Sequence, residues 1–457
     1  MLNAQQVIDA IHGSYQTGSK NGHRNVLALL DAMGVTMKTP YIHVAGTNGK
    51  GSTCAMLASI LKAAGYKVGL YTSPFLQHYQ ERIRLNGVPL TDELMVKYGN
   101  PLVKAAKEME ARGDFVTPFE MGTALAFAAF DGEDCDFAII EVGMGGRLDP
   151  TNVFGLPRAY GASQASRRDC QQSQSLVGTS SDLIPVPIAC AIAAIGLDHM
   201  GFLGDTLEEI AGEKAGIIKA NVPVVCYPAQ ESVRRVFAEK AAALHAPLVQ
   251  LDEGAILHVE GDMHGSTVTY QLAERWDDVR ISLPGQYQQR NAMTVLALVE
   301  ELRRLGHALP EEAVRKGLME TVWPARLEWA EQVLIDGAHN PQGVAALVDY
   351  VDTYLADKRR VLLSGVLADK LQPEMLWQMV HIARDIVTVT PDTPRALSAA
   401  EYAAALNACG GNAAPAATLT EGLQMALELA GEDGVVVAAG SLYFAGALRT
   451  EMNLPWK

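Results

Sequence analysis

The stretch His43-Val-Ala-Gly-Thr-Asn-Gly-Lys-Gly-Ser-Thr53 decides the fold, because it joins an apolar strand to a helix through a glycine-rich turn. Residues 41–45 predict a short buried strand, residues 54–64 predict the following helix, and residues 67–71 predict the next strand. A strand, a loop, a helix and a second strand in this order start a parallel α/β sheet.

The glycine-rich turn has the composition of a phosphate-binding loop. Its backbone N–H groups and the helix N-terminus behind it form a cradle for anions, and Gly49 and Gly51 let the backbone approach a phosphate closely. Lys50 would reach the β- and γ-phosphates of a nucleotide, and Ser52 would lie near its Mg²⁺ ion. In the usual pattern Ser or Thr follows the lysine directly, whereas here Gly51 intervenes. The flanking strand and helix favour a bound nucleotide over a turn without a ligand.

The rest of the chain continues the α/β pattern in two blocks. Helices are expected over 2–12, 24–33, 120–130, 206–215 and 288–305, and strands over 136–141, 189–196 and 223–226, with a β-hairpin appendage over 255–283. A second block starts near residue 322, with strands at 332–335, 360–364, 386–390 and 434–438. We expect an N-terminal P-loop ATPase-like domain with a parallel sheet over residues 1–315 and a smaller C-terminal Rossmann-like α/β domain over 316–457.

Composition excludes several classes of protein. The formal net charge of −15 argues against a nucleic-acid-binding protein, which needs a basic face for phosphates. Six scattered cysteines without a CxxC pair indicate neither a zinc site nor a disulfide framework, and they fit a reducing cytoplasm. The first residues lack the apolar block of a signal peptide, and no apolar run is long enough to span a membrane. We therefore expect a globular cytoplasmic protein that binds neither nucleic acid nor membrane.

Residues 155–185 do not fit the alternation of strands and helices. The stretch from 154 to 187 is rich in Ser, Gln, Gly and Arg and has no hydrophobic period. Such a segment buries too little apolar surface to offset the entropy that is lost on ordering. A structureless loop of this length is unusual inside a compact domain, so we expect a disordered insert.

Four further side chains could carry chemistry. Glu141 and Asp336 each end a predicted strand, and Glu141 is followed by a glycine-rich stretch. Ligands in open α/β sheets lie beyond the carboxyl ends of the strands, so Glu141 is placed to hold Mg²⁺ near the phosphate-binding turn. A lone strand-end carboxylate, a lone histidine such as His199 and a helical lysine such as Lys214 are each more often structural or solvated. The flanking glycines favour a functional Glu141, whereas His199 and Lys214 stay undecided on their own.

Taken together, the motifs resemble those of the folylpolyglutamate synthase/dihydrofolate synthase family in the Mur-ligase superfamily. The matching pieces follow the family order over nearly the whole chain: HVAGTNGKGST, YTSPFL, ERIRLNG, TPFE, EVGMGGRLDPTN, IGLDH, EKAGI, LPGQYQQRNA, PARLE, IDGAHNP and GSLYFAG. The ordered set is highly specific, although no single piece decides the match. The resemblance implies an N-terminal P-loop domain and a smaller Rossmann-like domain, with the active site between them.

The resemblance also implies roles for individual residues. Those that would hold ATP are Gly49, Lys50, Gly51, Ser52, Asn291, Arg326 and Asp336, and those that would coordinate Mg²⁺ are Ser73, Glu141 and His199. The pterin-binding stretch is matched by Thr117, Pro118, Phe119 and Glu120, with Phe119 as a ring platform, and the segment beside it by Leu148, Asp149 and Pro150. The expected catalytic residues are Lys50, Lys214 and His339, and Lys214 matches a lysine that is carbamylated in this superfamily.

The reaction that the resemblance implies is the ATP-dependent ligation of L-glutamate to the carboxylate of a (dihydro)pteroate or a tetrahydrofolyl-polyglutamate. The carboxylate would attack the γ-phosphate of ATP to give an acyl phosphate, and the glutamate amine would then displace phosphate. The partners are therefore small molecules (pterin or folate, L-glutamate and ATP), and the family implies a monomer. The TPFE match makes the bifunctional bacterial form plausible, although motif spacing does not separate the two acceptors.

The chain departs from the family pattern at three small places and one large one. Phe75 replaces a histidine in the TSP turn, Tyr287 opens the segment that usually begins HQ, and Ala325 interrupts the usual PGR. The large departure is the insert, for which two interpretations stay open. It is a surface excursion that leaves the site intact, which we favour because EVGMGG and IGLDH survive, or it leaves a catalytically impaired ATP- or folate-binding homologue.

Other function classes fit the sequence less well. A Mur-type ligase for a cell-wall precursor usually carries a separate UDP-sugar domain before the P-loop, and a P-loop that starts near residue 43 leaves no room for one. A P-loop motor or transport ATPase would turn over ATP without pterin or glutamate. A decayed binding protein is disfavoured because Lys50, Glu141, His199, Lys214 and Asp336 are all retained.

Overall fold

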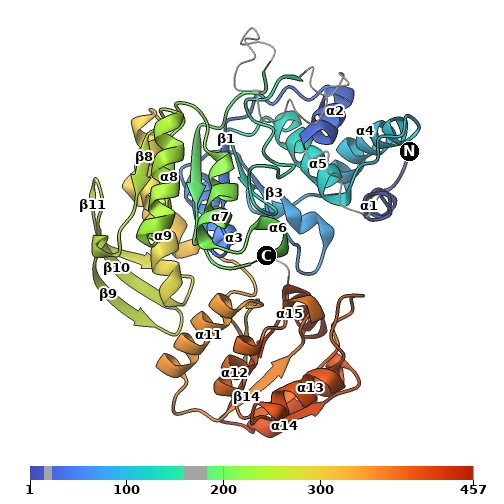
Figure 1. Ribbon diagram of the computed structural model, residues 1–457, viewed down its shortest axis with the longest axis vertical. Coiled ribbons are helices and arrows are strands. Elements are labelled where there is room, and N and C mark those ends of the chain that lie inside the picture. The colour runs from blue at the N-terminus through green and yellow to red at the C-terminus, as the bar shows by residue number, and fades with distance from the viewer. Residues whose placement is uncertain (15–22, 159–182, 199, 456–457) are drawn as a thin grey trace.

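The computed structural model describes residues 1–14, 23–158, 183–198 and 200–455, and these residues form two α/β domains (Figure 1). The larger, N-terminal domain is built on an eight-stranded sheet with the order β4-β3-β2-β5-β1-β6-β7-β8. Its strands are β1 (Tyr41–Ala45), β2 (Val68–Tyr71), β3 (Ile83–Leu85), β4 (Val88–Pro89), β5 (Phe137–Glu141), β6 (Ala189–Ile192), β7 (Val224–Cys226) and β8 (Leu248–Gln250). β1 lies between β5 and β6 and runs parallel to both, so the phosphate-binding turn leaves the centre of the sheet.

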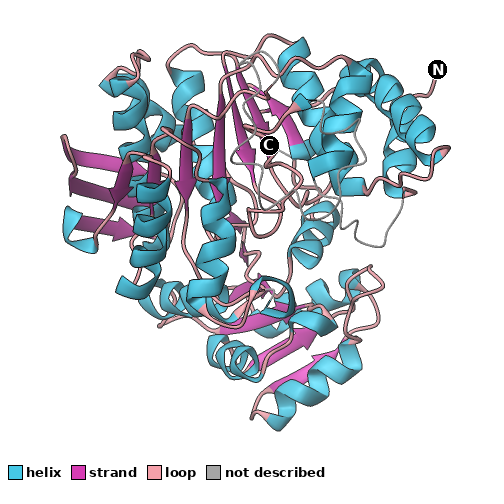
Figure 2. Ribbon diagram, turned by 45° about the horizontal axis from the view of Figure 1, so that its top comes forward, coloured by secondary structure: helices cyan, strands magenta, loops and turns pink. Residues whose placement is uncertain are grey.

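Helices cover both faces of this sheet (Figure 2). One face packs against α1 (Ala4–His12), α2 (His23–Met33), α4 (Asp92–Glu110) and α5 (Pro118–Gly132). The other packs against α3 (Lys50–Ala63), α9 (Gln286–Arg304) and α10 (Glu311–Glu320), while α6 (Met200–Leu203), α7 (Leu207–Lys214) and α8 (Glu231–Ala243) follow β6 and β7. Successive strand residues point to opposite faces, so the wholly buried β1 and β5 are mostly apolar, with His43 and Glu141 as the exceptions. No helix within the described ranges is both long and apolar enough to cross a membrane.

The predicted β-hairpin over 255–283 is confirmed and extended by a third strand. β9 (Ile256–Asp262), β10 (Gly265–Gln271) and β11 (Arg275–Ile281) form a separate antiparallel sheet in which β10 is central. Tyr270, Trp276 and Val279 are buried against α9, so one face of this sheet extends the core of the domain.

The C-terminal domain contains a six-stranded sheet with the order β12-β13-β17-β14-β15-β16. Its strands are β12 (Glu328–Ala330), β13 (Val333–Ile335), β14 (Arg360–Ser364), β15 (Asp385–Thr388), β16 (Asn412–Pro415) and β17 (Val435–Ala439). Its helices are α11 (Pro341–Tyr354), α12 (Pro373–Ile382), α13 (Ala399–Ala408), α14 (Leu419–Ala430) and α15 (Leu442–Glu451). α11, α12 and α13 pack on one face and α14 and α15 on the other, so the predicted Rossmann-like layering is present.

The domain boundary expected from the sequence stays a prediction. The predicted boundary between residues 315 and 316 falls inside α10, which packs against α3 so closely that a Cβ on Gly317 would lie 2.4 Å from the Ile60 Cα. The second sheet begins only at Glu328. We therefore propose residues 321–327 as the connection between the domains.

Two elements beside the glycine-rich turn differ in length from the prediction. α3 begins at Lys50 rather than at residue 54, because Gly49 takes the left-handed conformation (φ 84°) and turns the chain directly into the helix. β6 ends at Ile192 rather than at residue 196, because the chain after it leaves the sheet and packs on the turn. There the Thr47 N–H donates to the Ala194 carbonyl at 2.7 Å, and the Gly196 N–H donates to the Thr47 hydroxyl at 3.1 Å.

The two ends of the predicted insert meet. The Gly155 N–H donates to the Ile184 carbonyl and the Ile184 N–H donates to the Leu156 carbonyl, both at 2.9 Å. Pro157 and Leu183 then form an antiparallel bridge. The expectation of disorder falls mostly on residues 159–182, which lie outside the described residues.

We predict that replacing residues 159–182 with a four-residue Gly/Ser linker leaves the melting temperature within about 2 °C of the full chain. The antiparallel bridge already brings the two ends to strand-pair spacing, which a short loop can close. Scanning calorimetry measures the effect. Ile184→Asp in the full chain is the matched control and should lower the melting temperature by about 5 °C or more, because Ile184 is 1% exposed. A comparable fall in the shortened chain would mean that the segment contributes to stability.

Candidate active site

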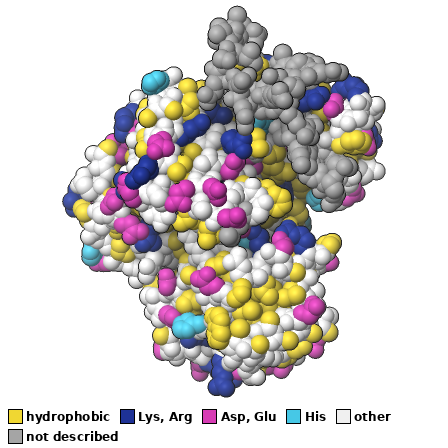
Figure 3. All heavy atoms as spheres, in the orientation of Figure 1, with side chains coloured by type: hydrophobic (Ala, Val, Ile, Leu, Met, Phe, Trp, Pro, Cys, Tyr) yellow, Lys and Arg dark blue, Asp and Glu magenta, His cyan; other side chains and the backbone are white. Residues whose placement is uncertain are grey.

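A cavity of about 1060 Å³ lies between the two domains. Its walls come from the turns after β1, β2 and β5 and, across the gap, from the turns after β13, β14 and β17. Parallel strands gather their carboxyl ends at one edge, so the edges of two sheets face each other here. Figure 3 shows Lys and Arg side chains gathered where the two domains meet. The predicted placement of the site between the domains agrees with this cavity.

The phosphate-binding turn holds two lysines on one carbonyl oxygen. The Lys50 Nζ donates to the Gly46 carbonyl at 3.1 Å and to the Thr47 carbonyl at 3.0 Å, and the Lys214 Nζ donates to the same Gly46 carbonyl at 2.8 Å. Lys214 is 3% exposed and lies behind the turn rather than in the cavity wall. Burial and then the nearby charge of Lys50 lower the pKa of Lys214 to about 7. This amine is therefore partly neutral at physiological pH.

A Cβ at either of two glycines of the turn would crowd a neighbouring side chain. A Cβ on Gly49 would lie 2.5 Å from the Asn291 Oδ1, and one on Gly51 would lie 2.9 Å from the Trp323 Nε1. Ser52 is buried and accepts a hydrogen bond at 3.1 Å from Gln288, which in turn accepts one at 2.9 Å from Asn291. The start of α9 therefore supports the turn, and this brings Asn291 next to the predicted phosphate site.

Glu141 and Ser73 form an oxygen-rich corner beside the turn. The Ser73 N–H donates to the Glu141 Oε2 at 2.9 Å, and Glu141 is 4% exposed. Burial raises the pKa of Glu141, whereas the nearby charge of Lys50 and the Ser73 N–H lower it. Burying a carboxylate is costly unless a cation lies near, and carboxylate and hydroxyl oxygens are ligands that suit Mg²⁺. These two residues therefore fit the predicted metal.

The third predicted metal ligand, His199, lies outside the described residues. Within the described ranges, no cluster of three or more His, Cys, Asp and Glu side chains is assembled for a metal ion. The metal-ligand set stays a prediction.

The predicted pterin-binding stretch forms the start of α5. Thr117 caps the helix, and the carboxylate of Glu120 accepts hydrogen bonds from the Thr117 N–H at 2.7 Å and from Asn25 at 3.1 Å. Glu120 is thus used mainly to fix the helix start, with Pro118 in its first turn. The Phe119 ring lies over Gly143, where a Cβ would be 2.3 Å from its Cζ, and lines the cavity. A glycine at 143 is therefore required to leave room for the ring.

Leu148, Asp149 and Pro150 line the same part of the cavity. Asp149 is buried and accepts hydrogen bonds from the Met144 N–H at 2.8 Å and from the Thr151 N–H at 3.0 Å, so it fixes the shape of this segment. Leu148 is 55% exposed and offers an apolar surface to a ligand. The two predicted substrate-binding segments thus lie on one wall of the cavity.

On the opposite wall, Asp336 organises the turn after β13. Its carboxylate accepts the Leu327 N–H at 2.9 Å and the Ala338 N–H at 2.8 Å. Burial raises the pKa of Asp336, and the charge of Arg326 opposes this shift. His339 lies in the same turn with its Nδ1 at 2.8 Å from the Gly337 carbonyl, and burial lowers the pKa of His339 to about 4. His339 is therefore neutral near pH 7, with Nδ1 as the donor to the carbonyl.

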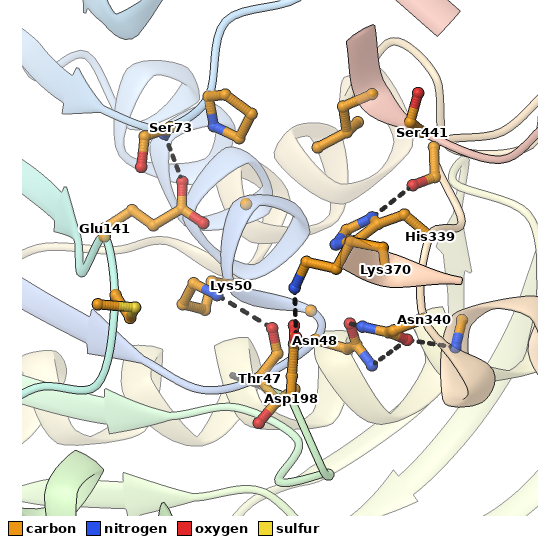
Figure 4. A pocket seen from close by; sticks show the side chains of 18 of the residues that line it. Thr47, Asn48, Lys50, Ser73, Glu141, Asp198, His339, Asn340, Lys370 and Ser441 are labelled. Atoms are coloured by element: carbon orange, nitrogen blue, oxygen red, sulfur yellow. Dashed lines mark hydrogen bonds and ion pairs between the residues drawn. The ribbon is translucent and has the colours of Figure 1, made fainter. Parts of the chain in front are cut away.

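The structure adds cavity residues that sequence reasoning missed (Figure 4). Lys370 reaches across from the C-terminal domain and pairs with Asp198 at 2.5 Å. Asn340 donates to the Asn48 Oδ1 at 3.0 Å and caps α11, while Ser441 caps α15. These residues follow the carboxyl ends of β13, β14 and β17, and a position after a strand end is a signal for a site residue that the sequence contains. It was not used, because these residues lie far from the phosphate-binding turn in the sequence.

The cavity thus has one end that suits phosphates and another that suits an apolar ring. The helices α3, α11 and α15 all begin at it, and helix N-termini favour anions. Of the predicted site residues that the structure describes, all but Lys214 line this one cavity. An arrangement of this kind can hold a nucleotide triphosphate, a second anionic substrate and an apolar ring system together.

Comparisons with known proteins give the same family. Residues 325–442 match the family model of the Mur ligase, glutamate ligase domain. The chain is 33% identical over 454 residues to the dihydrofolate synthase/folylpolyglutamate synthase of Bacillus subtilis (strain 168), and the match covers 97% of each chain. The Mycobacterium tuberculosis folylpolyglutamate synthase complexed with ADP has a TM-score of 0.85 at 28% identity, over 99% of each chain. An FPGS–AMPPCP–folate complex has a TM-score of 0.80 at 31% identity, over 99% of this chain and 100% of that chain. The chain belongs to the folylpolyglutamate synthase/dihydrofolate synthase family of Mur ligases.

Proposed function

We propose that the protein is an ATP-dependent amide-forming ligase that joins L-glutamate to the carboxylate of a (dihydro)pteroate or a tetrahydrofolyl-polyglutamate. The observation that carries this proposal is the single cavity of about 1060 Å³, in which Lys50 and Glu141 face the wall formed by the glutamate ligase domain. Phe119 lines the same cavity and supplies a ring-sized apolar surface for the pterin.

Some residues of the site bind the nucleotide, and others serve the activation of the acceptor carboxylate. The backbone of residues 46–51 and Lys50 hold the triphosphate, while Asn291, Arg326 and Asp336 complete the nucleotide site. The acceptor carboxylate attacks the γ-phosphorus in line, which breaks the bond to the β-phosphate oxygen and releases ADP. The amine of glutamate then attacks the acyl carbon, so that phosphate leaves and the amine loses a proton. The two domain walls exclude water, which protects the acyl phosphate from hydrolysis.

Glu141 and Ser73, together with His199, are the residues that would hold Mg²⁺. When bound there, the ion offsets negative charge on the transferring phosphoryl group. Glu141 is fixed at the end of β5 by the Ser73 N–H, so its carboxylate is already oriented before any ligand binds.

We also propose that Lys214 is carbamylated. Carbamate formation needs a neutral amine, and the lowered pKa of about 7 supplies one. The carbamate would place an anionic oxygen beside the turn and remove the repulsion between Lys214 and Lys50. His339 stays a predicted catalytic residue, whose neutral ring offers an acceptor to the cavity. A monomeric, cytoplasmic enzyme without nucleic-acid or membrane partners also stays a prediction.

The alternative of a catalytically impaired homologue finds no support in the geometry. The Gly155–Ile184 pairing closes the insert at its base. Lys50 and Lys214 both donate to the Gly46 carbonyl, and the Ser73 N–H holds Glu141 beside the turn. The shortened chain without residues 159–182 should therefore retain turnover as well as stability.

The first test is ADP release with Mg²⁺-ATP and L-glutamate, with dihydropteroate and tetrahydrofolate supplied separately. We predict release that depends on glutamate and on an acceptor, and a fall of at least about a hundredfold in Lys50→Ala, because the charge of Lys50 offsets that of the transferred phosphoryl group. Release with tetrahydrofolate alone would indicate a folylpolyglutamate synthase, and release with both acceptors the bifunctional enzyme. Acceptor-independent ATP turnover, or none from folded protein, would contradict the ligase assignment.

A second test uses ¹³C-bicarbonate and NMR spectroscopy of the whole protein. We predict a carbamate carbon signal that grows as the pH rises through about 7, the pKa of Lys214, because only the neutral amine adds carbon dioxide. Lys214→Ala should abolish the signal. Lys219→Ala is the matched control, since burial also lowers the pKa of Lys219, to about 8, whereas only Lys214 donates to the Gly46 carbonyl of the turn. A signal that is lost only in Lys219→Ala would mean that Lys219 is carbamylated rather than Lys214, and it would contradict the proposal.

A further inference from the structure

Arg82 is a cationic side chain in the cavity wall that the proposed reaction has not used. It ends the short helix of residues 79–82 and lies under two aromatic rings, with its guanidinium carbon 5.4 Å from the centre of Phe75 and 5.7 Å from that of Tyr79. Its Nε is buried and has no hydrogen-bond partner among the described residues. The Tyr71 hydroxyl is a hydrogen-bonding neighbour of the Arg82 side chain. The charge of Arg82 also helps to lower the pKa of the buried Glu141, but the two side chains form no ion pair among the described residues.

Most other cationic side chains that line the cavity already have an ion-pair or hydrogen-bond partner. Arg147 pairs with Glu213 at 2.8 Å, Lys370 pairs with Asp198 at 2.5 Å, and Arg395 pairs with Asp369. Lys50 donates to two carbonyls of the phosphate-binding turn, and Arg326 donates to the Ala325 carbonyl. Within the described ranges no carboxylate forms an ion pair with Arg82. A partly buried guanidinium without an anionic partner is costly, which indicates that a ligand supplies the anion.

Arg82 lies between the two ends of the cavity. Ser73, Glu141 and Phe119 line the same wall, and the Thr72 N–H before Ser73 donates to the Arg82 carbonyl at 2.9 Å. Tyr71, beside Arg82, lies with its ring centre 6.1 Å from that of Phe119. An acceptor whose ring lies on Phe119 and whose reacting carboxylate lies near Glu141 therefore passes Arg82.

The two candidate acceptors differ in the charge that they bring to this point. Pteroate carries one carboxylate, and that group is consumed in the ligation. A pteroylglutamate carries two, of which the γ-carboxylate is consumed and the α-carboxylate stays ionised throughout. This second anion needs a partner inside the cavity, and a guanidinium binds a carboxylate with two parallel charge-assisted hydrogen bonds.

We propose that Arg82 binds the α-carboxylate of the terminal glutamyl residue of a folate, and that it thereby favours folates over pteroate as acceptors. The proposal rests on the ligase function stated above and assigns specificity to one side chain of its site. The aromatic cage contributes by fixing the guanidinium plane: His12 stacks on Phe75 at 6.2 Å, and Tyr79 meets His12 edge-on at 5.3 Å.

A purely structural role for Arg82 predicts a different outcome. Cation–π contacts with Phe75 and Tyr79 would stabilise the loop after β2 whatever ligand is bound. Loss of such contacts would weaken pteroate and pteroylglutamate alike, and it would weaken the nucleotide through Ser73. The ratio of the two acceptor affinities separates the two roles.

The experiment measures the Kd of pteroylglutamate and of pteroate by titration calorimetry, with a non-hydrolysable ATP analogue present. In Arg82→Met we expect the Kd of pteroylglutamate to rise about tenfold or more, the effect of losing a charge-assisted hydrogen bond, while that of pteroate changes less than about threefold. Arg82→Lys keeps the positive charge but loses the two parallel N–H donors of the guanidinium, so it should bind pteroylglutamate more tightly than Arg82→Met and less tightly than the wild type. Arg395→Met, which removes a cavity arginine that already pairs with Asp369, is the matched control and should leave the ratio unchanged.

An equal loss for both ligands, or no change for either, would overturn the assignment of Arg82. The Kd of the ATP analogue and the melting temperature show whether the variant is folded. Wild-type protein that releases ADP with an acceptor but shows an unchanged ratio in Arg82→Met would refute this proposal alone. Wild-type protein that binds neither acceptor would refute the proposed function with it.

Discussion

The carbonyl oxygen of Gly46 is the point on which the site depends, because it accepts hydrogen bonds from both Lys50 and Lys214. Two ammonium groups on one carbonyl repel each other, and burial removes the water that would screen them. Burial and then the charge of Lys50 accordingly lower the pKa of Lys214 to about 7. Only glycine fits at 46, where φ is 148° and a Cβ would lie 2.8 Å from the Ala193 Cβ. The carbonyl oxygens of the turn therefore orient the lysine side chains without neutralising their positive charge. A site for phosphate requires such a charge.

The second constraint is that two sheets end at the same gap. Each sheet brings its turns to the carboxyl edge of its strands, and the connection at 321–327 sets these edges face to face. Contacts such as Lys370–Asp198 and Asn340–Asn48 cross the gap directly. Because these groups come from different domains, any relative movement of the domains changes the distance between the phosphate-binding turn and the C-terminal wall of the cavity. Ligation of three substrates needs such an arrangement, since the acyl phosphate has to be formed and consumed away from water.

Much of the fold could be predicted because its signals are local. Apolar residues in β1 and β5, and the glycine-rich turn after β1, set the central parallel strands without knowledge of any distant contact. The elements that were missed have weaker signals: α4 contains Pro101 and many charged residues, and β3, β4 and β8 are only two or three residues long. The start of α3 at Lys50 was also missed, since residues 50–53 (KGST) contain no apolar side chain from which a helical period could be detected.

For the site, the sequence by itself determined the glycine-rich turn after β1 and the places of Glu141 and Asp336 at the ends of strands, because these follow from residue type and from the adjacent strand. Their roles in binding stay predictions. The motif order also singled out Lys214, whose significance no local pattern could establish. Only the tertiary structure decided that Lys214 shares a carbonyl with Lys50 and that Glu120 is used to cap α5. It also decided that Arg82 lines the cavity with an Nε that has no hydrogen-bond partner among the described residues. Charges act through space rather than along the chain. Which side chains of this protein are paired and which stay available to a ligand is therefore settled only when strands from distant parts of the sequence pack side by side.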